Sequence, residues 1–357
     1  MPLSVPKLLT AIPLLLVLLL VALSQPLRAG EARIFIYHRF ADSRYPSTNV
    51  AGDIFAEQLE VLDREHYTVL SLGRVVERLA ANQELPDKCV VLTVDDAFNS
   101  FVESGWPLIR RYGYPVMLFV NTASTGQPGY LNWGQLRALE QQGVEIGSHG
   151  NQHLHLATPD AGESVAAWED KVRAEFARSR AEFQRELGHV PKLFAYPYGE
   201  YSPALIELVK ASGYQAAVAQ QSGVASRFSD LYSLPRFPMG GPYATLQGFV
   251  EKLHMHAMPV RVIRPRTPLI DSLSPPALEV LFPAPGQLDL GRLNCFVNGR
   301  PDCEVKRLTG SDVRYRIVAT KPLLARRSKY TLTVPDQDGE WYWFSQLWLN
   351  PEVAEGY

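Results

Sequence analysis

Cysteine is scarce in this chain of 357 residues, which has three of them, and a fold that depends on a disulfide framework is therefore excluded. No basic stretch is interleaved with aromatic residues, so nucleic acid is not expected as a partner. The chain also has no internal repeat and no low-complexity tract. With 46% hydrophobic residues, it is long enough to bury one large core and a smaller one.

The first residues have the order of charged, apolar and small residues that is typical of a secretory signal peptide. Lys7 precedes an uncharged stretch at 8–27, and small residues follow Arg28. We predict a signal peptide at 1–29 and export to the periplasm, the cell envelope or the extracellular space. Because the apolar run is slightly long, an N-terminal membrane anchor is the alternative. No cysteine lies near its end, so a lipoprotein is not expected.

An acidic doublet at the end of an apolar strand is the centre of the sequence. The run 90–94 is rich in β-branched residues and predicts a buried strand of a parallel sheet. Asp95 and Asp96 follow it directly, at the carboxyl edge of the sheet, where parallel α/β proteins have their active sites. The alternative is that one of the two carboxylates only caps the helix expected at 98–112.

Strands and helices alternate over about 220 residues, which predicts an incomplete (β/α) barrel in a domain at 30–257. The expected strands are 33–37, 69–70, 90–94, 115–120, 144–147, 192–196, 215–220 and 231–237. The expected helices are 53–66, 74–82, 98–112, 132–143, 163–187, 203–212 and 244–255.

The pattern changes after Pro259. Five prolines between 259 and 276 predict a linker at 258–276, in which no helix can persist. Short alternating segments then predict a small all-β sandwich domain at 277–357, with hairpin turns at Asn298-Gly299 and Asp338-Gly339. Three tryptophans in its last strand are expected in the sandwich core rather than on a sugar-stacking platform; they are Trp341, Trp343 and Trp348.

The sandwich contains two of the three cysteines. Cys295 and Cys303 lie four residues on either side of Gly299, so a hairpin that turns there would place them opposite each other. We therefore predict a disulfide between them, which an oxidising compartment would preserve, and a free thiol at Cys89.

Three strand ends of the barrel have polar residues that one barrel mouth can bring together. They are the acidic doublet, the pair His149 and His153, and the segment 196–199. Two histidines four residues apart and one carboxylate form the nitrogen and oxygen set of an open zinc site. Either histidine alone would more often be a hydrogen-bonded structural residue.

On these segments the sequence resembles the polysaccharide deacetylases, carbohydrate esterase family 4, which have the NodB-homology domain. Thr93-Val94-Asp95-Asp96-Ala97 resembles the first family motif, usually Thr-Phe-Asp-Asp-Gly. His149-Gly150-Asn151-Gln152-His153 resembles the second, His-[Ser/Thr]-x-x-His, and Ala195-Tyr196-Pro197-Tyr198-Gly199 resembles the third, Arg-x-Pro-x-Gly. The resemblance covers about residues 31–256. Tyr37-His38-Arg39 and the third motif make the chain most similar to the poly-N-acetylglucosamine deacetylases.

The resemblance implies a metal-dependent hydrolase that removes N-acetyl groups from a polysaccharide of N-acetylglucosamine type. Asp96, His149 and His153 would hold a divalent ion, zinc or else Ni²⁺, Co²⁺ or Fe²⁺. Asp95 would take the proton of the attacking water. The backbone N–H of Tyr198 would stabilise the oxyanion.

The sequence departs from the family motifs at several positions. Gly150, where the second motif usually has Ser or Thr, and Ala97, in place of the glycine of the first motif, are mild changes, and two other departures affect the chemistry. Ala195 stands in place of the arginine that orients the first aspartate, and Leu234-Pro235-Arg236 stands roughly where the family has a late Leu-x-His motif with the general acid. We expect Arg236 to reach Asp95 in place of the missing arginine, with a surface arginine as the alternative. We expect His38, at the end of the first strand, to be the acid, with His155 as the second choice.

Two other functions are compatible with the same residues. A carbohydrate-binding homologue that has lost activity is favoured by the missing late histidine and disfavoured by the intact Asp, Asp, His, His set. A hydrolase of O-acetyl esters or small cyclic amides is the other alternative, although export argues against small-molecule metabolism. Envelope or membrane association is compatible with each reading.

Overall fold

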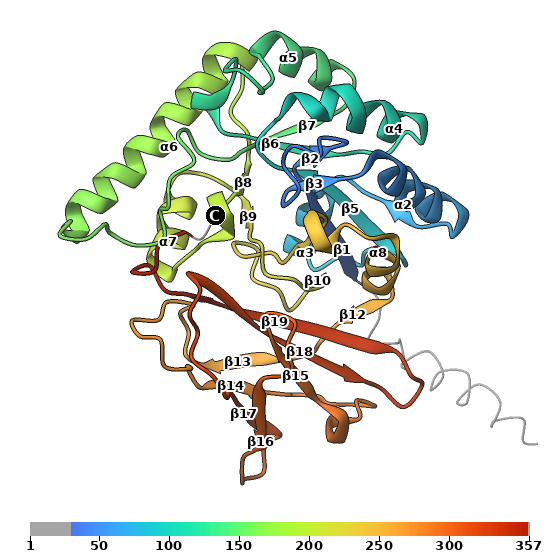
Figure 1. The fold of residues 1–357 in the computed structure, drawn as a ribbon, viewed down its shortest axis with the longest axis vertical. Coiled ribbons are helices and arrows are strands. Elements are labelled where there is room, and N and C mark those ends of the chain that lie inside the picture. The colour runs from blue at the N-terminus through green and yellow to red at the C-terminus, as the bar shows by residue number, and fades with distance from the viewer. Residues whose placement is uncertain (1–29, 356–357) are drawn as a thin grey trace, which may run out of the picture.

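The computed structural model describes residues 30–355, so the predicted signal peptide or anchor at 1–29 lies outside the described residues. Figure 1 shows two parts: a curled sheet with helices around its outer side, and a β-sandwich beneath it in orange and red. The incomplete (β/α) barrel and the following β domain that the sequence predicts are both confirmed. No helix within 30–355 is long and apolar enough to cross a membrane.

The large sheet places its strands in the order β10-β1-β5-β6-β7-β8-β9, with β4 beside β5 and β11 beside β1. All of these pairs are parallel except β1 with β10. The carboxyl ends of β5, β7 and β8 therefore meet at one edge. The strands are β1 Glu31–Tyr37, β4 Thr68–Val69, β5 Cys89–Val94, β6 Met117–Val120, β7 Glu145–Ser148, β8 Leu193–Ala195, β9 Ala216–Val218, β10 Ala225–Ser226 and β11 Phe237–Pro238. A separate parallel pair is β2 Arg39–Phe40 and β3 Asn49–Val50.

The helices pack their apolar sides on this sheet. They are α2 Gly52–Arg64, α3 Leu72–Ala80, α4 Trp106–Arg111, α5 Trp133–Gln141, α6 Val165–Leu187, α7 Pro203–Ala211 and α8 Leu246–Leu253. Short 3₁₀ turns are η2 Thr122–Ser124, η3 Pro197–Gly199, η4 Gly241–Tyr243 and η5 Leu290–Arg292. The capping box predicted at the start of α5 is present: Asn132 accepts a hydrogen bond from the Gln135 N–H, and the Gln135 side chain accepts one from the Asn132 N–H.

Two expected elements differ in the structure because of prolines. The helix expected at 98–112 is a π-helical turn, η1 Phe101–Gly105, followed by α4. Pro107 has no N–H to continue an α-helical ladder across the junction. The strand expected at 231–237 is reduced to an isolated bridge at Leu234 and to β11, since the prolines there cannot donate to a sheet.

The C-terminal part is a sandwich of two four-stranded sheets, in the orders β12-β19-β18-β15 and β13-β14-β17-β16. The strands are β12 Met255–Ala257, β13 Arg261–Arg264, β14 Leu278–Leu281, β15 Asn294–Val297, β16 Cys303–Arg307, β17 Arg314–Ala319, β18 Arg327–Pro335 and β19 Trp341–Leu349. Thus β12 and β13, within the segments assigned from sequence to the barrel domain and the linker, pair with strands of the sandwich.

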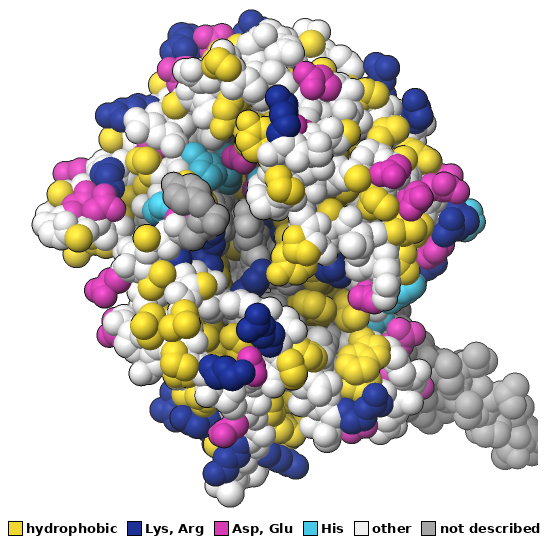
Figure 2. Space-filling view, in the orientation of Figure 1, with side chains coloured by type: hydrophobic (Ala, Val, Ile, Leu, Met, Phe, Trp, Pro, Cys, Tyr) yellow, Lys and Arg dark blue, Asp and Glu magenta, His cyan; other side chains and the backbone are white. Residues whose placement is uncertain are grey.

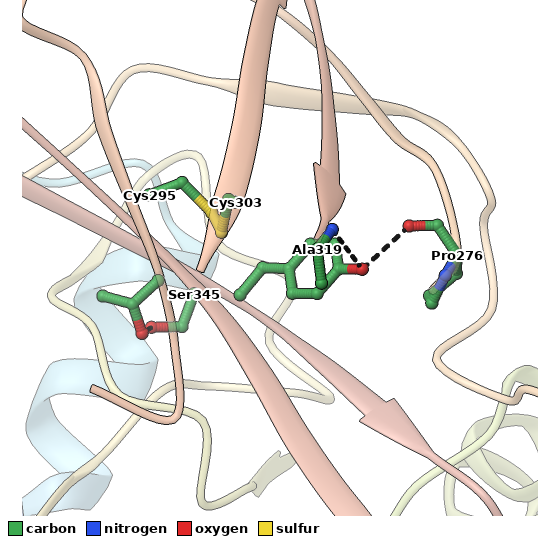
Figure 3. Close-up of a disulfide and its surroundings, with 7 residues drawn as sticks. Pro276, Cys295, Cys303, Ala319 and Ser345 are labelled. Atoms are coloured by element: carbon green, nitrogen blue, oxygen red, sulfur yellow. Dashed lines mark hydrogen bonds between the residues drawn. A yellow bond between two sulfur atoms is a disulfide. The ribbon is translucent and has the colours of Figure 1, made fainter. Parts of the chain in front are cut away.

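The turn at Asn298-Gly299 does not make the predicted hairpin. A bridge joins Val297 and Arg300, but β15 then pairs with β18 and β16 with β17, in opposite sheets. The predicted disulfide between Cys295 and Cys303 is present and joins the two sheets, with Cα atoms 5.7 Å apart. The Tyr330 hydroxyl accepts a hydrogen bond from the Ala319 N–H and donates one to the Pro276 carbonyl. Figure 3 shows the disulfide with Ala319 and Pro276 in its surroundings. Cys89 is a free, buried thiol, as predicted.

We expect the disulfide to stabilise the sandwich. It closes a loop of eight residues, so its reduction should lower the free energy of unfolding by about 2–3 kcal/mol through loop entropy. Alkylation of denatured but unreduced protein should label Cys89 alone, and reduction should expose the other two thiols to mass spectrometry. Labelling of Cys295 without reduction would contradict the prediction.

Two of the three tryptophans of β19 lie in different places, one in the sandwich core and one at the boundary of the two parts. Trp348 is fully buried in the sandwich core, as expected. Trp343, which was also expected there, is half-buried and packs its ring 5.5 Å from the ring of Phe237 in the barrel. Leu347 belongs to a buried cluster with Phe194 and Tyr196 of the barrel. Alternate residues of β19 therefore face the barrel, which the sequence pattern alone does not reveal.

Candidate metal centre

The acidic doublet lies where β5 ends and the chain turns sharply. Asp96 and Ala97 have positive φ angles of 74° and 56°, a left-handed conformation that non-glycine residues rarely adopt. The turn explains how two adjacent carboxylates serve one site: Asp95 stays fully buried, and Asp96 is directed into the mouth of the barrel.

Asp96, His149 and His153 bring three possible ligand atoms together, as the sequence predicts. The two histidine Nε2 atoms are 3.2 Å apart. Asp96 Oδ1 lies 3.7 Å from His149 Nε2 and 3.5 Å from His153 Nε2. Ligands placed tetrahedrally at about 2.0–2.1 Å from a zinc ion lie about 3.4 Å from each other. The three side chains therefore fit one small divalent ion.

The protonation of the histidines also fits a metal ligand. Burial lowers the pKa of His149 and that of His153 to about 4, so both rings are neutral at pH 7. His149 Nδ1 lies 2.8 Å from the Ala195 carbonyl oxygen and can donate to it, which leaves Nε2 free to bind an ion. The third motif thus orients a histidine through its backbone, even though Ala195 replaces the usual arginine.

Glu175 holds the loop that carries His153, and the sequence analysis missed it. This buried carboxylate of α6 accepts hydrogen bonds from the backbone N–H groups of Asn151 and Gln152, the first at 2.9 Å. It lies on the buried side of α6, next to Phe176. The sequence did indicate Glu175, because it stands among the apolar positions of an amphipathic helix, and a carboxylate buried there requires a hydrogen-bond partner.

Arg236 reaches Asp95 as expected. Its Nη1 and Nη2 lie 2.7 Å and 2.8 Å from the two carboxylate oxygens, and both side chains are fully buried. The guanidinium also donates to the Ala219 carbonyl and the Thr93 hydroxyl. Burial is the largest single effect on the pKa of Asp95 and raises it, but the charge and hydrogen bonds of Arg236, together with the neighbouring histidines, outweigh burial and lower that pKa to about 2. Asp95 is therefore an anion beside the three candidate ligands, with Oδ2 3.9 Å from His149 Nε2.

Tyr198 and His38, the other predicted site residues, lie at the same mouth. The Tyr198 ring is 4.4 Å from the His153 ring, and its backbone has a positive φ of 58°. Within 30–355 no acceptor is found for the Tyr198 N–H. His38 is close enough that its charge would affect the pKa of both Asp95 and His153, and its side chain has no hydrogen bond to another described residue.

A second cluster joins this mouth to the sandwich. The Glu200 carboxylate is fully buried and accepts from Arg326 and Arg327, while His155 Nδ1 lies 2.9 Å from it. These partners lower the pKa of Glu200 to about 2 although burial opposes them. His155 stacks on the Tyr198 ring, with 3.9 Å between centroids. With two guanidinium groups already on Glu200, the cluster is an ion-pair network between the two parts rather than a second metal site.

An Asp-His-His set with a buried carboxylate beside it, at the mouth of an incomplete barrel, is the kind of site found in metal-dependent hydrolases. The comparisons with known proteins agree with this class. Residues 82–217 match the model of the polysaccharide deacetylase family. Over these residues the chain is similar to the polysaccharide deacetylase family, and its fold agrees with this similarity.

Individual relatives are distant. YxkH of Bacillus subtilis (strain 168) is 26% identical over 211 residues, which are 58% of this chain and 71% of that protein. The poly-beta-1,6-N-acetyl-D-glucosamine N-deacetylase of Escherichia coli (strain K12) is 25% identical over 231 residues, which are 55% of this chain but only 34% of that enzyme. Among solved structures, the Streptococcus pyogenes deacetylase PplD in complex with acetate aligns with a TM-score of 0.57 and 23% identity, over 63% of this chain and 99% of that one.

Proposed function

We propose that this chain is a metal-dependent hydrolase that removes N-acetyl groups from an exported polysaccharide of the N-acetylglucosamine type. The observation that carries the proposal is the convergence of Asp96, His149 and His153, with the ionised Asp95 beside them. The named activity of the E. coli relative supports the substrate class. The disulfide supports an oxidising compartment such as the periplasm or the extracellular space.

In this proposal Asp95 is the general base. A divalent ion, zinc or a similar one, would supply Lewis acidity, which lowers the pKa of water from 15.7 to about 7 and polarises a carbonyl group. Asp95 accepts the proton of the attacking water, which requires an ionised carboxylate. Arg236 keeps this carboxylate ionised and fixes its orientation through the two parallel hydrogen bonds.

The remaining steps need a donor for the oxyanion and a donor for the leaving amine. The backbone N–H of Tyr198 has no acceptor of its own among the described residues, so it can donate to an oxyanion. His38 can protonate the amine, since its ring lies at the mouth without a hydrogen-bond partner in 30–355. His155 is less suited, because Glu200 already occupies its Nδ1.

We expect the His38→Ala variant to lose about 10²-fold in turnover, the effect of removing a general acid, while its metal content stays near one equivalent. Acetate release and metal analysis on the same preparation measure both quantities. His155→Ala serves as the matched control and should keep more of the activity. Unchanged turnover in the His38 variant would exclude its role as the acid.

The test of the function is acetate release from a panel of polymers by stripped enzyme with and without added metal. The panel contains poly-N-acetylglucosamine, chitin oligomers, peptidoglycan and acetylxylan. Release from the amides but not from acetylxylan supports an N-deacetylase, and release from acetylxylan alone supports an O-acetyl esterase. Binding without any release would favour the inactive carbohydrate-binding homologue.

A further inference from the structure

A cleft of about 680 Å³ lies between the barrel and the sandwich and opens next to Tyr198. The sandwich supplies one of its walls with the outer face of the sheet β12-β19-β18-β15: Lys329, Thr331 and Thr333 alternate along β18 and all line the cleft. Figure 2 shows this hollow between the two parts, with histidine side chains above it and Lys or Arg side chains inside.

The charges that line the cleft have one sign. Lys252, Arg327 and Lys329 are among the lining residues, and no aspartate or glutamate of residues 30–355 is. Arg327 is neutralised by its ion pairs with Glu200 and Glu355. Neither lysine has a carboxylate within 4.0 Å in the described part of the chain, and only Lys252 is affected by a more distant carboxylate, that of Glu251, so the positive charge of the cleft is only weakly compensated.

Within residues 30–355 each lysine donates only to a backbone oxygen. Lys252 Nζ donates to the Gly248 carbonyl at 2.9 Å, and Lys329 Nζ donates to the Gln220 carbonyl at 3.4 Å. Burial lowers the pKa of both, that of Lys329 to about 8 with a contribution from Arg327. An anion in the cleft would supply the counter-charge that both ammonium groups lack.

The cleft is continuous with the candidate metal centre. Gly199 of the third motif packs so closely on Gln220 that a Cβ at Gly199 would lie 2.4 Å from the Gln220 Cβ. Lys329 therefore lies directly behind the loop that carries Tyr198, whose ring contacts His153. Trp343 and Tyr243 add aromatic surface of the kind on which sugar rings pack.

We propose that this cleft binds a negatively charged sugar unit, so that the substrate is an N-acetylated polysaccharide that also has carboxylate or phosphate groups. This inference rests on the proposed function for the position of the acetylated unit at the metal centre. The same lysines disfavour a polymer that is already deacetylated, because its free ammonium groups would face two unpaired cations.

The test compares two anionic ligands with a neutral one. The dissociation constants of the zinc-loaded full chain are measured for three ligands: an oligosaccharide of alternating N-acetylglucosamine and glucuronic acid, its neutral methyl ester, and a 6-phosphorylated N-acetylglucosamine oligomer. We expect at least one of the two anionic oligomers to bind about tenfold more tightly than the neutral ester, and their comparison tells carboxylate from phosphate.

Lysine variants assign the effect to the cleft. Lys252→Gln and Lys329→Gln should each weaken binding of the anionic oligomer about tenfold and leave the ester unchanged, which is the loss expected of one charge-assisted hydrogen bond. Lys306→Gln removes the same charge from the exposed strand β16 and is the control. Lys329→Arg should retain most of the preference. Equal affinity for charged and neutral oligomers, or an unchanged preference in both Gln variants, would overturn the proposal.

Acetate release separates this inference from the proposed function. The binding preference is read from dissociation constants, which do not depend on turnover. Preferential binding with no acetate release from any oligomer would leave the anionic cleft intact and refute the deacetylase. Acetate release from the neutral ester, with equal binding of charged and neutral oligomers, would support the deacetylase and refute the anionic cleft.

Discussion

In the Asp95→Asn variant we expect turnover to fall by about 10²–10⁴-fold while one equivalent of metal remains bound. The amide keeps the shape of the carboxylate and can still accept from Arg236, but it cannot take a proton from water. Acetate release and metal analysis on the same sample provide the measurement.

Variants of the three candidate metal ligands serve as the comparison for Asp95, because they should lose the metal as well as the activity. Asp96→Asn, His149→Ala and His153→Ala should each lose tight metal binding together with activity, because each removes one of three ligand atoms. Metal loss in the Asp95 variant with retention in the Asp96 variant would reverse the assignment of the two carboxylates.

The Arg236→Ala variant should retain its metal and move the acidic limb of the pH–rate profile upward. With Arg236 present, the pKa of Asp95 is about 2, so the base is ionised throughout the neutral range. Without it, burial dominates and raises the pKa, so Asp95 becomes protonated, and the rate falls, at a higher pH than in the parent. Loss of a buried ion pair should also lower the free energy of unfolding by about 3–5 kcal/mol.

Thermal melts and a lysine variant distinguish the pKa effect from unfolding. Arg236→Lys should recover part of the profile, because an ammonium supplies charge without the two parallel hydrogen bonds. Arg178→Ala, at an exposed arginine of α6, is the control and should match the parent in both stability and pH dependence. A profile of the folded Arg236→Ala variant that overlays the parent's would falsify the role of this arginine.

The candidate site was predictable where it depends on short-range geometry. Asp96, His149 and His153 could be found because two histidines four residues apart follow one strand and the carboxylate follows another. Arg236 could be inferred because Ala195 left the buried Asp95 without a cation, and few positions late in the barrel could supply one.

The rest depended on contacts that the local sequence does not encode. Glu175 and Glu200 escaped notice because their partners are backbone groups at 151–152 and arginines at 326–327, far along the chain. The chain does turn at 298–299, as predicted, but turn residues do not determine which sheet each flanking strand joins. The sheet that each strand joins depends on how the sandwich core is buried.

The position of β19 affects how the protein can reach its native state. Its parallel partner β12 comes directly after the barrel, whereas β19 follows the rest of the sandwich. The apolar contacts of Trp343 with Phe237, and of Leu347 with the cluster around Phe194, therefore form only after the sandwich strands have been synthesised. Until then the barrel has an uncovered apolar face, which favours aggregation. Removal of the sandwich would accordingly yield an aggregation-prone fragment rather than a minimal barrel.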